Sequence, residues 1–62
     1  MPMSETIAAI RREAGLTQEE MARRLYVTRQ AVSRWENAET TPGIDMVNDI
    51  IKLLYFDYEV LE

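Results

Sequence analysis

Four hydrogen-bond donors recur at helical spacing in the middle of the chain: Arg29, Gln30, Ser33 and Arg34. They form two pairs that are each four residues apart, so on a helix they project from one side. The major groove of duplex DNA admits a helix, and there arginine can pair bidentately with guanine and glutamine with adenine. These four residues are therefore candidate base contacts.

Three further polar residues, Gln18, Thr28 and Asn37, fall where helices are expected to begin or end. Hydroxyl, amide and backbone N–H groups at helix ends can hold phosphate oxygens. We therefore take these three residues as candidate phosphate contacts.

The composition argues against several other classes of protein. A chain of 62 residues forms one domain, here 1–62, with one small core. It has neither Cys nor His, which removes disulfides, thiolate metal sites and the commonest general base. We therefore expect no enzyme, no cofactor and no metal site. No apolar run is long enough for a membrane helix, and the first residues do not resemble a signal peptide, so the expected location is cytoplasmic.

The net charge of −4 is unusual for a protein that binds nucleic acid, but the charge is unevenly distributed. Residues 1–37 contain six Arg and five Glu, whereas residues 38–62 contain one Lys and six carboxylates. Phosphate affinity depends on the local surface rather than on the total charge. The acidic C-terminal part nevertheless predicts weak, salt-sensitive DNA binding by a single copy.

Apolar residues recur at helical spacing throughout and never alternate as in a strand. The first helix is expected over 4–14, with Ser4 as N-cap and Gly15 as its stop. Thr17 and Glu20 have the spacing of a capping box at the start of a second helix. Its buried stripe is expected to comprise Met21, Ala22 and Leu25.

A third helix is expected from Arg29 to Glu36 or Asn37, with Thr28 as its cap and Val32 and Trp35 on its inner face. After a breaker-rich loop over 38–43, a fourth helix is expected over 44–54. Asp57 is expected to cap a last short turn through Leu61. The predicted fold class is all-α, a compact four- to five-helix orthogonal bundle.

Only about three residues, Tyr26 to Thr28, connect the second and third helices. That connection is too short for antiparallel stacking, so the helices are expected to cross steeply, as in a helix-turn-helix. The crossing requires a small residue, which Ala22 supplies. The predicted motif covers residues 18–37.

Over this stretch the chain resembles the lambda-repressor/Cro-type family of bacterial and phage regulators, also called the xenobiotic-response-element family. The residues that carry the resemblance are 15–22, 27–37 and Pro42, within a match from about Ile7 to Leu61. It implies a five-helix fold that places the third helix in the major groove of double-stranded DNA, usually as a dimer. It also implies that Gln18 and Asn37 bind backbone phosphates.

The resemblance further implies that Arg11 and Glu36 form a buried ion pair between the first and third helices. The family often has glycine at three positions where this chain has Tyr26, Ala38 and Tyr55. Because a residue other than glycine at positive φ is costly, the local turns are expected to differ there.

The sequence therefore predicts a sequence-specific regulator of transcription, a repressor that binds duplex DNA as a homodimer. The alternative is a protein-interaction module or antitoxin-like partner that keeps the fold without binding DNA. Two assignments stay open. Tyr55, Phe56 and Tyr58 can close the core or form a dimer surface. Arg23 and Arg24 can contact DNA or pair with Glu19 and Glu20.

Overall fold

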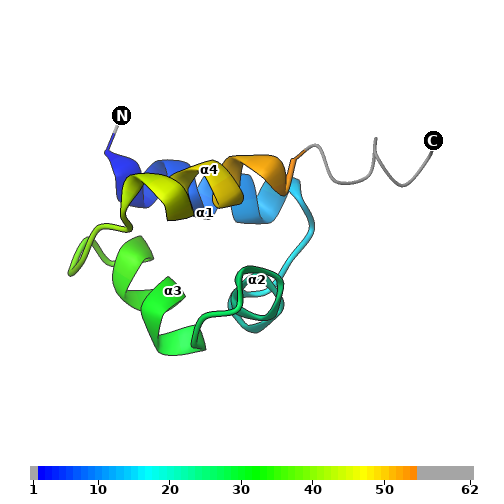
Figure 1. The fold of residues 1–62 in the computed structure, drawn as a ribbon, viewed down its shortest axis with the longest axis horizontal. Helices are drawn as coiled ribbons and strands as arrows, with labels where there is room; N and C mark the ends of the chain where they lie inside the picture. Colours follow the sequence, from blue (N-terminus) through cyan, green and yellow to red (C-terminus); the bar gives the residue numbers. More distant parts are fainter. Residues whose placement is uncertain (1, 55–62) are drawn as a thin grey trace.

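A computed structural model describes residues 2–54, and all the regular secondary structure in that range is helical. The helices are α1 (Met3–Glu13), α2 (Gln18–Leu25), α3 (Arg29–Glu36) and α4 (Ile44–Lys52). Helices α1 and α4 run along one side of the molecule, and α2 and α3 form the other side (Figure 1). This arrangement confirms the predicted all-α class. The turn expected over 57–61 and the aromatic residues Tyr55, Phe56 and Tyr58 lie outside the described residues.

The first helix begins earlier than predicted. Ser4 lies inside the first turn of α1, and Pro2 occupies the N-cap position with extended backbone angles. The backbone carbonyl of Pro2 accepts a hydrogen bond from the Thr6 N–H at 3.1 Å. Proline suits this position because its fixed φ is compatible with helix entry and no backbone N–H is needed there. The prediction of Ser4 as the cap was therefore wrong.

The beginnings of α2 and α3 match their predicted caps. Thr17 and Glu20 form a capping box, in which Glu20 N–H donates to Thr17 Oγ1 at 3.1 Å and Thr17 N–H donates to Glu20 Oε1 at 2.8 Å. At the start of α3, Thr28 Oγ1 accepts from the Ala31 N–H at 3.1 Å. Each cap satisfies backbone donors that the helix itself leaves unpaired.

The fourth helix ends two residues before the predicted boundary. Helix α4 stops at Lys52, and the N–H groups of Leu53 and Leu54 bond to the carbonyls of Ile50 and Ile51, three residues back. Such bonds form the tighter turn that often follows an α-helix.

None of the helices within residues 2–54 combines the length and the apolar character needed to cross a membrane.

Helices α1, α2 and α3 all end in the same hydrogen-bonded motif. In each, an N–H beyond the helix bonds to a carbonyl five residues earlier: Leu16 to Arg11 at 3.0 Å, Val27 to Ala22 at 3.0 Å, and Glu39 to Arg34 at 2.8 Å. This pattern, the Schellman motif, requires a left-handed residue just before that N–H. The residues there are Gly15, Tyr26 and Ala38, with φ of 73°, 60° and 61°.

The turns at Tyr26 and Ala38 therefore keep the left-handed backbone that glycine would adopt there. The expectation that these turns would differ was wrong. The hydrogen bonds that close the two helices hold the conformation, although it costs a residue with a Cβ about 1–2 kcal/mol. Two of these three helix ends, at Tyr26 and Ala38, therefore carry local strain.

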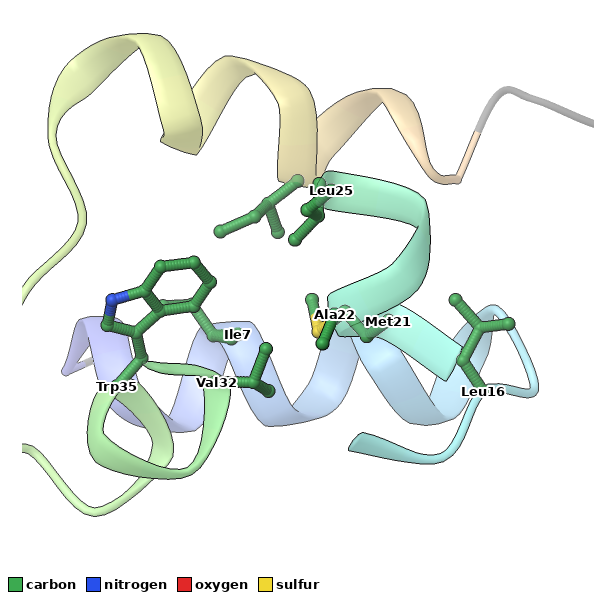
Figure 2. Close-up of a cluster of buried hydrophobic side chains, with 8 residues drawn as sticks. Ile7, Leu16, Met21, Ala22, Leu25, Val32 and Trp35 are labelled. Atoms are coloured by element: carbon green, nitrogen blue, oxygen red, sulfur yellow. The ribbon is translucent and has the colours of Figure 1, made fainter. Parts of the chain in front are cut away.

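The core lies between all four helices. Its buried side chains come from α1 (Ile7), α2 (Met21, Ala22, Leu25), α3 (Val32, Trp35), α4 (Ile50) and the first connection (Leu16). Figure 2 shows the indole of Trp35 beside Val32, directed toward Ile7 and the residues of α2. Ala22 is only 3% exposed, so its small side chain permits the close crossing of α2 and α3. The predicted inner faces of both helices are confirmed.

The strain at Ala38 predicts that a glycine there stabilises the protein. We expect Ala38→Gly to raise the free energy of unfolding by up to about 1 kcal/mol, because relief of the strain exceeds the added freedom of the unfolded chain. Gly15→Ala is the matched control and should lower it by about 1 kcal/mol. A Cβ at Gly15 meets nothing within 4 Å, so the loss there is conformational. Urea unfolding measures both changes, and a destabilised Ala38→Gly variant would contradict this interpretation.

Candidate nucleic-acid interface

Helix α3 has an inner face in the core and an outer face in solvent. Val32 is fully buried and Trp35 is 8% exposed. Of the candidate base contacts, Arg29, Gln30 and Arg34 are exposed, whereas Ser33 is half-buried. Because the Thr28 cap and the inner face fix the rotation of α3, the long polar side chains project away from the protein.

Arginines are frequent in α2 and α3. Residues 21–35 contain four arginines and no carboxylate. Arg23 pairs with Glu19 at 3.4 Å on the exposed surface of α2, which is one of the two alternatives that the sequence left open for that residue. Arg29 and Arg34 form no ion pair with any residue in the range 2–54. The outer face of α3 therefore presents two cations that are not neutralised by the described part of the chain.

The carboxylate of Glu36, at the end of α3, connects three elements. Arg11 of α1 donates from Nε to Oε2 at 2.7 Å and from Nη2 to Oε1 at 3.2 Å. Gln18, the first residue of α2, donates from Nε2 to Oε1 at 3.1 Å. Arg11 also donates to the backbone carbonyl of Leu16 at 3.0 Å. The paired side chains of Arg11 and Glu36 are only 16% and 9% exposed, so water screens the pair little.

The pKa of Glu36 reflects this environment. Burial raises it and is the largest single influence, but hydrogen bonds from Arg11 and Gln18 and the charges of Arg11 and Arg12 together bring it below its ordinary value. The pKa of Arg11 is raised, first by its hydrogen bond to Glu36 and then, against the effect of burial, by the charge of that carboxylate. Both groups are therefore charged at neutral pH.

The candidate phosphate contacts lie at helix ends, as expected, and each already has a partner within the protein. Gln18 donates one amide hydrogen to Glu36, and its second amide hydrogen is available for another acceptor. Thr28 accepts from the Ala31 N–H and retains its own hydroxyl proton. Asn37 Nδ2 donates to Ser33 Oγ at 3.4 Å, a long bond. The structure thus brings Ser33 and Asn37 together. Gln18 and Thr28 each retain a donor, an amide hydrogen and a hydroxyl hydrogen respectively.

Two of these contacts were not anticipated from the sequence. The bond from Gln18 to Glu36 joins residues 18 positions apart, and no helical periodicity relates them. The bond from Asn37 to Ser33 spans four residues. Spacing on α3 could have indicated that second contact, because residues four apart are neighbours on a helix.

Helices α2 and α3 cross over a small buried alanine, are joined by a three-residue turn, and expose a donor-rich face. That geometry defines a helix-turn-helix protein. The family model described as Helix-turn-helix matches residues 7–55, and the chain belongs to this family.

A curated relative, an HTH-type transcriptional activator called BcrR from Enterococcus faecalis, is 36% identical over 52 residues. The alignment covers 84% of this chain and 26% of that protein, so the chain spans about a quarter of its relative. No solved structure matches the chain significantly.

The contacts of Glu36 predict how stability depends on pH. Because its pKa is lowered on folding from an ordinary value of 4.5, the carboxylate contributes stability above that value and loses it as pH falls through the lower folded value. We expect Glu36→Gln to reduce the free energy of unfolding by about 2 kcal/mol at pH 7 and to flatten its decline in acid. Urea unfolding between about pH 3 and pH 7 measures both effects.

The control for this experiment is Glu39→Gln, which removes an exposed carboxylate beyond the end of α3. It should leave the stability at pH 7 within about 0.5 kcal/mol of the parent. If the Glu36→Gln and Glu39→Gln variants followed the same curve, the central role of Glu36 would be refuted.

Proposed function

We propose that this chain is the DNA-binding domain of a transcription regulator that reads the major groove with residues 28–37. The family membership supports this proposal, as does a relative whose name is that of a transcriptional activator. The observation that carries it is the outer face of α3, where Arg29 and Arg34 are exposed without an ion pair among residues 2–54.

The candidate residues divide into two kinds of contact. Arg29, Gln30 and Arg34 have the length and exposure to reach base edges, where each bidentate pair discriminates by about 1–3 kcal/mol. Ser33 is shorter and half-buried, so it suits a base edge or phosphate that lies close to the helix. This division assigns sequence reading chiefly to the three long side chains.

Gln18, Thr28 and Asn37 would position α3 by holding the phosphate backbone. Gln18 is the best defined of them, because the Glu36 carboxylate fixes one end of its amide. A phosphate bound by the second amide hydrogen would then be held at a set distance from α3. Glu36 itself would act as a positioning residue that contacts no DNA.

We further propose that the protein acts in the cytoplasm as a homodimer and represses transcription. Two copies would present recognition helices about 34 Å apart on one face of the duplex, which suits an operator of inverted half-sites. Linking two weak contacts raises the effective affinity and offsets the acidic C-terminal part. The aromatic residues Tyr55, Phe56 and Tyr58, outside the described range, are the proposed dimer contacts.

The second candidate function is a protein-interaction module that retains the helix-turn-helix fold. It is favoured by the same acidic and aromatic C-terminal residues, three of which are Asp57, Glu59 and Glu62. The two functions differ in their response to salt, since binding to DNA releases counterions and weakens steeply as salt is raised.

The DNA-binding proposal predicts that Arg29→Ala and Arg34→Ala each weaken binding by about 1–3 kcal/mol. Where the lost side chain contacts phosphate, the slope of log K against log salt concentration should also become shallower, by the release of about one counterion. Fluorescence anisotropy with a labelled 30-base-pair duplex, titrated at several salt concentrations, measures both quantities.

The matched control is Lys52→Ala, which removes a positive charge from the last turn of α4. It should bind within about twofold of the parent, since a lone exposed charge away from the interface contributes little. If the parent protein were not retained on any duplex at low salt, the proposed function would fail and the interaction-module alternative would be favoured.

A further inference from the structure

Tyr26 is the most exposed large hydrophobic residue in the range 2–54. It is 94% exposed, while the other large hydrophobic residues that are exposed at all extensively, Met3, Ile44, Ile51 and Leu54, have exposed fractions between 36% and 77%. Its backbone lies in the left-handed region with φ of 60°. A bulky residue there is strained, and glycine or asparagine would occupy the same turn more easily. Strain of this kind is commonly found where a side chain is used for function.

The turn aims Tyr26 away from the core and beside the start of α3. Val27 packs against the core cluster, so the residues on either side of it, Tyr26 and Thr28, face solvent. Thr28 caps α3, which places the tyrosine two residues from that cap. Helix α3 begins at the edge of the molecule farthest from α1 and α4 (Figure 1).

The neighbours of Tyr26 indicate what it would contact. The other exposed large hydrophobic residues, Met3, Ile44, Ile51 and Leu54, belong to α1, α4 or the turn after α4. Within residues 18–36, which comprise α2, α3 and the turn between them, Tyr26 is thus the one exposed large hydrophobic residue. Arg29, three residues further along, is exposed and forms no ion pair with any residue in the range 2–54. A cation beside the tyrosine suits a polyanion such as the phosphate backbone.

We propose that Tyr26 is a further DNA contact, whose phenol hydroxyl donates to a backbone phosphate at the edge of the groove that α3 enters. Recognition helices contact bases through their N-terminal residues, and tyrosine is among the side chains that bind phosphates in such complexes. This contact would fix how deeply the N-terminal end of α3 enters the major groove. This inference rests on the proposed function, because it places Tyr26 in the same interface.

The test compares variants of the full chain by fluorescence anisotropy, using a labelled 30-base-pair duplex enriched by the parent protein from a random pool. Tyr26→Phe removes only the hydroxyl and should weaken binding about fivefold, the effect of one hydrogen bond. Tyr26→Asn also removes the ring and should weaken binding about tenfold or more. Thermal unfolding should show that Tyr26→Asn is at least as stable as the parent, since asparagine tolerates the left-handed turn.

Ile44→Ala is the control, because it trims an exposed apolar side chain at the start of α4, and it should leave affinity unchanged. Binding of both Tyr26 variants within twofold of the parent, with Arg29→Ala still impaired, would overturn this inference and leave the proposed function standing. Failure of the parent and all variants to bind any duplex would instead overturn both.

Discussion

The ion pair between Arg11 and Glu36 is the interaction on which the arrangement of the helices depends. Its Nε–Oε2 distance is 2.7 Å, and the same carboxylate accepts from Gln18 at the beginning of α2. One side chain of α3 therefore sets the position of α1 and of the first turn of α2. In a domain of this size the hydrophobic core is small, so a polar contact that fixes three elements has a large share in specifying the arrangement.

This constraint also connects stability with the proposed DNA contacts. The amide of Gln18 is held by the group that anchors α3, so the phosphate contact and the base contacts belong to one rigid unit. Removing a partner from a largely buried pair leaves an uncompensated charge, which costs more than the pair itself contributes. A change at Glu36 is therefore expected to affect DNA binding by altering the positions of Gln18 and α3, although the Glu36 side chain lies on the protein side of α3.

The sequence predicted the parts of the fold that carry local signals. The capping box at Thr17 and Glu20 and the cap at Thr28 each depend on residues three positions apart, and apolar spacing identified Val32 and Trp35 as inner residues. Competing local preferences explain the two errors. Pro2 occupies the N-cap position that was predicted for Ser4, and the turn at Tyr26 keeps a left-handed backbone although the residue there is not glycine. The bond between Gln18 and Glu36 could not be predicted, because it depends on how two helices cross.

Sequence selection from a random pool of duplex DNA tests the central claim most directly, namely that residues 28–37 read specific bases. The parent protein is expected to enrich a consensus of two inverted half-sites about one helical turn apart, whereas Arg29→Ala and Arg34→Ala variants lose preference at particular positions of each half-site. A pool that shows no enriched sequence after selection by the parent protein, or the same consensus for the parent and both variants, would contradict it.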